Sequence, residues 1–466
     1  MDEQRNCSLS RNKIAWLLLG LFSLSVPNPK AVLAAECSPD ICVGNPCTIT
    51  GHHELEPNCS LDFSNQDVTI ADDAVLQVTG DGATQIAAQN LTLRGAIQAD
   101  TTARSEIVVN IAGKFIIPAG ARGEIKAGDN DSRASGPIRL TAGGEVDLQG
   151  SAEFSNTPGG QFFIVGRQVM VNQAIVTQGP GRVDIRASAG PIAIHKPIDV
   201  SGTGQRQGGS IFLLATGDVT VAAPLLLKAP ATSSGNGFVL EGRNVYVKSS
   251  TTSSMIDLSS GDGSTSGGGK IIAHSDDASG ESGLVVLDGR ISLDSGNNGS
   301  AGELAVSAEA KLNISGKISA KASGPSGSGG TLLLLGKPES TIRLSGSFIA
   351  TGEGRGGEIE IGAVEEKAVK AIVFLNDVTL NTQSAGTGGV NRLRYRRVFR
   401  AMGNGIVKLL STPNSTARGN IVECECLDNN PADGTCDEDA CIRSPSGFKS
   451  ALTLPALQLR PTVFEP

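Results

Sequence analysis

The chain has 466 residues, of which 59 are glycine; 39% are hydrophobic and only 3% are aromatic. This composition argues against a broad globular core built on large rings and suits a narrow interior filled by Val, Ile, Leu and Ala. The net charge of −8 and the pI near 5.2 argue against a general affinity for nucleic acid, which needs a basic surface.

Residues 1–34 have the composition of a secretory signal peptide. Basic residues precede an apolar run over residues 14–26, which is too short to span a membrane as a helix. Small residues before Ala35 suit a cleavage site, so we expect the mature chain to begin near Ala35. The sequence therefore predicts a secreted or cell-surface protein without a transmembrane helix, and the periplasm stays open as an alternative.

Cysteines gather in two even groups near the two ends of the mature chain, and the long stretch between the groups has none. An oxidising compartment favours disulfides over zinc thiolates, and the spacings fit no common zinc pattern. The first group defines a Cys-rich N-terminal cap over residues 35–61, and we expect disulfides within each group, with the connectivity open. The expected disulfide cysteines are Cys37, Cys42, Cys47 and Cys59 in the first group, and Cys424, Cys426, Cys436 and Cys441 in the second.

Residues 62–389 carry an internal repeat of about 28 residues. Each unit opens with a pair of small residues, usually Gly-Gly, followed by a short apolar strand, as at residues 159–164, 208–213 and 329–334. Inside a unit, three short runs alternate apolar and polar residues, which places Ile, Val and Leu on one side of each strand. Three short strands per unit predict an all-β fold, a single-stranded right-handed parallel β-helix whose glycines supply positive φ and tight corners.

We expect ten or eleven coils, stacked about 4.8 Å apart. The glycine- and serine-rich stretch before each pair varies in length, which is typical of a solenoid with one looped edge. A disordered chain and an array of β-sandwiches are the alternatives, and the persistent alternation and the few aromatic residues favour the solenoid. The residues expected to point inward include Phe163, Leu213, Val219, Val247, Ile291, Leu312, Ile314, Leu333 and Ile342.

The repeat pattern breaks near residue 390. Residues 390–445 are expected to form a C-terminal basic strand and a Cys-rich cap, and residues 446–466 an extended tail. The arginines of residues 391–400 alternate with apolar residues, which predicts a last strand with a charged solvent face; contact with nucleic acid, acidic glycans or lipopolysaccharide is the alternative. The acidic segment 428–439 is either a calcium-binding loop or an acidic disulfide-bridged loop, and the sequence leaves both open.

Side chains that could carry catalysis are few and scattered along the sequence. The histidines are His52, His53, His195 and His274, and none of them sits in a cluster with the spacing of metal ligands. His195 follows the alternating run at residues 192–194, so we expect it at an outward position on the surface. Asp276-Asp277, Glu365-Glu366 and Asp428 are the candidate acids. The pair at 276–277 has no matching acid or base one coil away, as glycoside hydrolysis would need. We therefore expect no catalytic residues, no cofactor and no bound metal ion.

The units, of the form Gly-Gly-x-Ile-x-Ile followed by Val-x-Val and Ile-x-Ala-x-Gly runs, resemble the large bacterial exoproteins of the filamentous haemagglutinin type over residues 62–389. Those proteins are secreted adhesins of two-partner secretion systems. The resemblance implies a bacterial surface protein, exported through an outer-membrane secretion partner. We expect a non-enzymatic adhesin or structural surface protein that binds glycans or cell-surface proteins at many points along its length. A β-helix polysaccharide lyase or glycosidase is the alternative.

Overall fold

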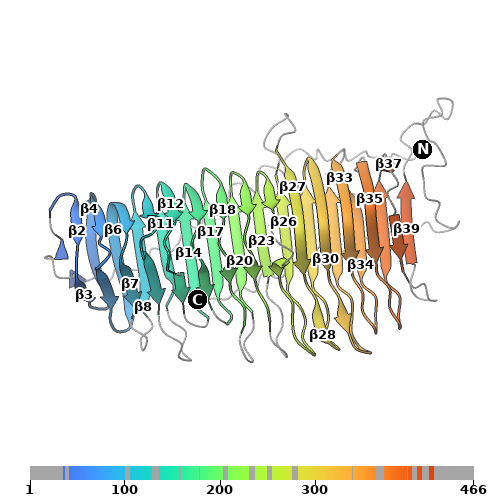
Figure 1. Ribbon diagram of the computed structural model, residues 1–466, viewed down its shortest axis with the longest axis horizontal. Coiled ribbons are helices and arrows are strands. Elements are labelled where there is room, and N and C mark those ends of the chain that lie inside the picture. Colours follow the sequence, from blue (N-terminus) through green and yellow to red (C-terminus); the bar gives the residue numbers. More distant parts are fainter. Residues whose placement is uncertain are drawn as a thin grey trace, which may run out of the picture.

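The computed structural model of the chain is one long rod of stacked coils (Figure 1). Its elements are β-strands that pair in parallel with their equivalents in neighbouring coils, so the expected fold is confirmed: a single right-handed parallel β-helix. The described residues stack 14 or 15 strands on each side of the rod, more than the ten or eleven coils expected. The part of the chain that the structure describes contains no helix long and apolar enough to cross a membrane. That part comprises residues 35–36, 41–42, 44–99, 105–127, 136–152, 154–156, 159–177, 179–202, 208–229, 237–248, 254–274, 282–337, 340–363, 372–395, 397–400, 407–411 and 419–424.

Each coil contributes strands to three faces of the rod, which we call faces 1, 2 and 3 in chain order. Face 1 contains β1 (Ala35–Glu36), β8 (Ser105–Ile111), β11 (Ile138–Ala142), β14 (Gln161–Gly166), β17 (Arg182–Ala187), β20 (Ser210–Ala215), β23 (Gly237–Gly242), β26 (Gly268–Ala273), β29 (Glu303–Ala308), β32 (Thr331–Gly336), β34 (Glu358–Ala363), β36 (Val390–Tyr395) and β39 (Gly419–Cys424). Face 2 contains β2 (Cys47–Ile49), β9 (Phe115–Ile117), β12 (Glu145–Leu148), β15 (Gln168–Val171), β18 (Ile192–Ile194), β21 (Val219–Val221), β24 (Val245–Val247) and β37 (Arg397–Arg400).

Face 3 contains β3 (His52–Leu55), β5 (Val75–Val78), β7 (Ala96–Ala99), β10 (Glu124–Ala127), β13 (Phe154–Asn156), β16 (Ile175–Thr177), β19 (Ile198–Asp199), β22 (Leu225–Leu226), β25 (Ser254–Asp257) and β38 (Val407–Leu410). Longer strands bend around a corner and belong to two faces. These are β4 (Cys59–Ile70) and β6 (Gly82–Leu93) on faces 1 and 2, and β27 (Leu284–Ser292), β30 (Lys311–Ser319), β33 (Thr341–Ile349) and β35 (Ile372–Asn381) on faces 2 and 3.

The glycine pairs of the sequence mark the entry to face 1 in each coil. The strand after Gly302 pairs with the strand after Gly330, in the register Glu303 to Thr331, and that strand pairs with the next one, in the register Thr331 to Glu358. The spacing between pairs in the sequence is therefore the length of one coil.

Inward side chains stack into apolar ladders that fill the rod. Seven of the nine residues expected to point inward are buried: Leu213, Val219, Val247, Ile291, Leu312, Ile314 and Ile342. The expectation is wrong for Phe163 and Leu333, because their neighbours Phe162, Leu332 and Leu334 are the buried residues of β14 and β32. Both strands are apolar on consecutive positions, so no polar residue in the sequence indicates which side faces the core.

In several pairs, the second glycine is required by close approach between the backbones of adjacent coils. A Cβ on Gly330 would lie 2.0 Å from the carbonyl oxygen of Gly302, and one on Gly357 would lie 2.1 Å from the carbonyl oxygen of Gly330. The backbone of these glycines does not adopt positive φ, so the expected conformational role is not the reason for them. Positive φ occurs instead at the bend between faces 2 and 3, where Gly289 and Gly316 pair in register with φ of 119° and 126°.

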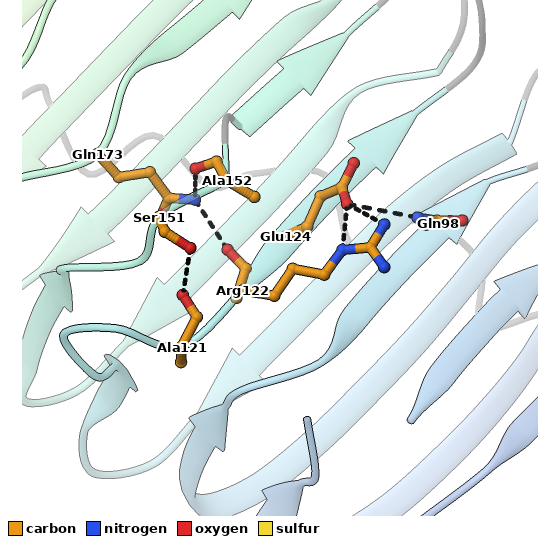
Figure 2. Close-up of polar contacts among 8 residues, drawn as sticks. Gln98, Ala121, Arg122, Glu124, Ser151, Ala152 and Gln173 are labelled. Carbon is orange, nitrogen blue, oxygen red and sulfur yellow. Dashed lines mark hydrogen bonds and ion pairs between the residues drawn. The ribbon is translucent and has the colours of Figure 1, made fainter. Parts of the chain in front are cut away.

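A buried glutamine ties three coils together at another corner between faces 2 and 3. Gln173 is 2% exposed, and its Nε2 donates hydrogen bonds to the carbonyl oxygens of Gly123, at 2.8 Å, and Ala152 (Figure 2). Outside the same corner, the Arg122 guanidinium donates to the Glu124 carboxylate, at 2.9 and 3.1 Å. The buried amide thus satisfies carbonyl groups that the turn leaves without a ladder partner.

The parallel stacking extends beyond residues 62–389 at both ends. At the N-terminal end, β2 pairs with β4 and β3 pairs with β5. At the C-terminal end, β39 pairs with β36. The expected signal peptide at residues 1–34 and the expected tail at residues 446–466 lie outside the described residues.

Candidate functional site

The histidines of the described residues do not converge on a common site. His52 and His53 lie in β3, where His53 Nε2 is 2.8 Å from the carbonyl oxygen of Thr50. His195 is exposed directly after β18, at the outward position expected for it. Within the described ranges, no three His, Cys, Asp or Glu side chains are grouped so that they could hold a metal ion.

His274 is held between two carboxylates from neighbouring coils. Its Nε2 lies 2.9 Å from Glu241 Oε1, and its Nδ1 lies 3.6 Å from Glu309 Oε1, which Lys337 Nζ also approaches to 2.5 Å. The hydrogen bond to Glu241 raises the pKa of His274, and the negative charges of both glutamates add to this effect. The same hydrogen bond lowers the pKa of Glu241. These side chains form a ladder of ion pairs along the rod and do not face one another across an open cleft.

The candidate acids of the sequence are not placed by the structure. Residues 276–277, 365–366 and 428–439 lie outside the described residues, so the acid pairs and the candidate calcium loop stay predictions.

One disulfide closes the N-terminal end of the rod. Cys42 and Cys47 are bonded, with their Cα atoms 5.4 Å apart. Cys59, the first residue of β4, is also disulfide-bonded. Cys424 ends β39, and the remaining expected cysteines, Cys37, Cys426, Cys436 and Cys441, lie outside the described residues.

The basic stretch differs from its predicted role as a last strand with a charged solvent face. Arg392 in β36 does point away from the core, since its neighbour Leu393 is 1% exposed. However, Arg392 itself is buried, and its Nη1 lies 3.2 Å from Glu358 Oε1 and 3.1 Å from Glu360 Oε2. Because β39 follows β36 in the stack, this strand lies between two others, and its first arginine pairs with acids of the preceding coil.

The outer side of face 1 carries large apolar side chains. We call two in-register lines of outward residues the outer rows. The first outer row contains Val108, Arg139, Phe163, Asp184, Phe212, Val239, Lys270, Ala305 and Leu333. The second contains Thr141, Val165, Arg186, Leu214, Glu241, Ile272, Ser307 and Leu335. The apolar members stay partly exposed, so face 1 presents an apolar surface along the rod with no sheet packed over it among the described residues.

Arginines and phenylalanines alternate in the middle of this surface. The Arg182 guanidinium carbon lies 4.5 Å from the centre of the Phe212 ring and 5.6 Å from that of Phe163. The Arg139 guanidinium carbon lies 4.5 Å from the centre of the Phe163 ring. Asp184, between the two rings in register, is 2% exposed and accepts hydrogen bonds from Arg182 at 2.7 Å and from Arg186 at 2.8 and 3.1 Å. The paired charges and the contacts between arginine and ring hold the two rings in place.

A groove runs beside face 1 in the C-terminal half of the rod. It lies where the corner loops that connect face 3 to face 1 return to face 1. These loops span residues 258–267, 293–302, 320–330 and 350–357. Its volume is about 450 Å³. The polar lining residues with side-chain hydrogen-bonding groups are Thr265, Ser266, Ser300, Glu303, Ser328, Thr331 and Arg355, and the outward apolar ones are Ala305 and Leu333.

Neither the outer rows nor the groove was anticipated from the sequence. The available signal was the absence of alternation in β14, β20 and β32, where four or more consecutive apolar residues occur. Such runs place apolar side chains on both sides of a strand. No family model, no curated protein and no solved structure matches this chain.

Proposed function

We propose that the protein is a non-enzymatic attachment protein that binds glycans or cell-surface proteins through the outer side of face 1. The observation that carries this proposal is the group of partly exposed Phe, Val and Leu side chains in the outer rows, among which charged residues such as Arg139 and Lys270 are interspersed. Apolar side chains gathered on the surface of a folded protein are typical of an interaction site. Aromatic side chains flanked by arginine are also enriched at the centres of interfaces.

The polar clusters on the described surface support attachment over catalysis. Asp184 is neutralised by two arginines, and His274 is neutralised by carboxylates of adjacent coils. A general acid or base needs access to the substrate and a proton that can move to it. Groups whose charges are already paired in this way suit a structural role. The lyase or glycosidase alternative would require a set of acids or bases converging on one sheet.

The proposed location is outside the cell, either secreted or on the cell surface, with an outer-membrane secretion partner. The resemblance of the repeats to filamentous haemagglutinin-type exoproteins and the signal-like residues 1–34 motivate this part of the proposal. A disulfide at the N-terminal end is in keeping with an oxidising compartment.

The test removes the two rings of the first outer row with Phe163→Ala and Phe212→Ala together. The full chain and the variant are applied to immobilised glycans and to immobilised cell-surface proteins, and retained protein is measured. We expect the double variant to lose at least about tenfold in binding, because aromatic anchors dominate interfaces. Tyr246→Ala is the matched control, since Tyr246 is an outward aromatic residue on face 2.

Two outcomes contradict the proposal. Equal losses in the double variant and in Tyr246→Ala would show that face 1 is not the binding surface. Release of sugar fragments from any polysaccharide by the full chain would favour the lyase or glycosidase alternative.

A further inference from the structure

The corner loops of the C-terminal half stack on one another as regularly as the three faces do. β28 (Ser295–Asn297) pairs with β31 (Ala322–Ser323), and isolated bridges join Thr265 to Ser300, Ser300 to Ser328, and Ser328 to Arg355. The loops therefore form a wall, visible beside β28 along the rod (Figure 1). Because equivalent residues of successive coils build this wall, the groove between it and face 1 runs parallel to the rod axis.

Backbone bonds fix the wall before any ligand arrives. The Ser266 amide donates to the Ser300 carbonyl at 2.9 Å, and the Gly329 amide donates to the Arg355 carbonyl at 2.8 Å. The base of each loop is closed as well: the Gly330 amide donates to the Ala320 carbonyl at 3.1 Å. Side chains carried by such a wall lose little conformational freedom on binding.

The wall presents a row of hydroxyl groups that make no side-chain hydrogen bond within the part of the chain that the structure describes. Ser264 and Ser266 donate to loop carbonyls, at 2.5 and 2.6 Å. By contrast, the hydroxyls of Thr265, Ser300 and Ser328 make no side-chain hydrogen bond to any described residue, and all three line the groove. They recur once per coil, at the spacing of about 4.8 Å between parallel strands. This row offers donors and acceptors at a regular repeat along the groove.

The remaining lining indicates the chemistry of the ligand. Ala305 and Leu333 are outward residues of face 1 and give the floor an apolar strip. Glu303 and Arg355 contribute one negative and one positive charge, so the groove has no excess of positive charge to attract a polyanion. The net charge of −8 for the chain also opposes binding of a polyanion. An extended, uncharged ligand with alternating hydroxyl and C–H surfaces fits a hydroxyl row beside an apolar strip.

We propose that this groove binds a neutral polysaccharide chain lying along the rod axis, with its hydroxyl groups on the row of Thr265, Ser300 and Ser328. The length of one sugar unit in an extended chain is close to the spacing of the coils, so successive units meet equivalent groups. The inference rests on the proposed attachment function and specifies one ligand class for it. Regular subsites of this kind give avidity along a polymer that single sugars cannot provide.

The experiment measures binding of the full chain to a panel of immobilised neutral polysaccharides, namely α- and β-linked glucans, mannan and galactan. Polygalacturonate and heparin serve as polyanions for comparison. Ser300→Ala combined with Ser328→Ala removes two hydroxyls without changing the backbone, and we expect about tenfold weaker binding to the neutral polymer. Arg355→Ala, an exposed change in the same wall, is the second variant and should also weaken binding. Ser347→Ala is the control, because Ser347 is a partly exposed serine of β33 that lies outside both the groove and the outer rows of face 1.

The outcomes separate this inference from the proposed function. Binding of a neutral polysaccharide that falls in both groove variants and not in Ser347→Ala supports the inference. Unchanged binding in the double serine variant, binding of polyanions alone, or binding of none of the panel overturns it. The attachment function would survive each of these three results if the double variant Phe163→Ala with Phe212→Ala still reduced binding to cell-surface proteins. If the full chain bound neither polysaccharides nor cell-surface proteins, both the attachment function and the inference would be overturned.

Discussion

Two adjacent phenylalanines of β14 provide a direct test of how the strands are oriented. Phe162 is fully buried in register with Ile138 and Val183, and its ring lies 6.2 Å from that of Phe154. Replacing a buried Phe by Ala costs about 3–5 kcal/mol in unfolding free energy, because the change removes apolar burial and leaves a cavity. We therefore expect Phe162→Ala to destabilise the rod by an amount in this range.

Phe163→Ala should cost much less, although the two residues are chemically identical and adjacent. Phe163 points outward and is partly exposed, and its main described contacts are the guanidinium groups of Arg139 and Arg182. A partly solvated cation–π contact contributes about 0.5–1 kcal/mol. With the partial loss of apolar contact added, we expect a cost of about 1–2 kcal/mol for this variant.

The assay is equilibrium unfolding in urea followed by far-ultraviolet circular dichroism, with amide hydrogen exchange of the β14 region as a local measurement. The local measurement is needed because coils of a solenoid can open separately. Val165→Ala, an outward change on the same strand, is the control. A loss of stability in Phe163→Ala equal to or larger than that in Phe162→Ala would refute the assigned orientation of this strand.

Three further predictions concern the corners and the ion pairs of the rod. Gly330→Ala should lower the free energy of unfolding in urea by more than about 1 kcal/mol, since the new Cβ would lie 2.0 Å from the Gly302 carbonyl oxygen. An unchanged unfolding midpoint would contradict the close-approach explanation. Gln173→Leu should cost about 1–3 kcal/mol, because it leaves buried carbonyl groups without a donor; a more stable variant would show that the unpartnered Oε1 of this amide costs more than its bonds contribute. The pKa of His274 is raised in the folded protein, so protonated His274 stabilises the fold below its ordinary pKa of 6.5, and this contribution is lost as the pH rises through the folded pKa. The pKa of Glu241 is lowered in the folded protein, so ionised Glu241 stabilises the fold above its ordinary pKa of 4.5. Thermal melts of His274→Gln and the parent chain should therefore differ most between about pH 4.5 and 6.5 and converge at higher pH, and a difference that grows above pH 7 would reverse this sign.

The repeat pattern of the residues and the resemblance of the repeats to known exoproteins both predicted a β-helix. The glycine pairs and the alternation within each unit are local features, and each coil pairs with its nearest neighbour in the sequence. A repeat whose contacts are all between neighbouring units is readable from the sequence, because no distant segment competes for the same strand edges. The exposed position of His195 after β18 followed from the same alternation.

The candidate site could not be read in this way. Which of Phe162 and Phe163 is inward depends on how the coil closes, because both sides of β14 are apolar. Burial of Arg392 depends on acids of the preceding coil and on a further strand stacked beyond it. These relations join residues about one coil apart, and alternation within a strand carries no information about them.

The sequence by itself thus determined the repeat, the strand content and the β-helix, because periodic glycine and period-two apolar patterns act within one coil and between adjacent coils. The tertiary structure alone decided which residues face outward in strands that are apolar on both sides, such as β14 and β32, and why the second glycine is needed in pairs such as 329–330. It also placed Thr265, Ser300 and Ser328 in one row along a groove. The physical reason is that strand orientation, close backbone approach and the stacking of loops of unequal length are set by how whole coils fit against one another.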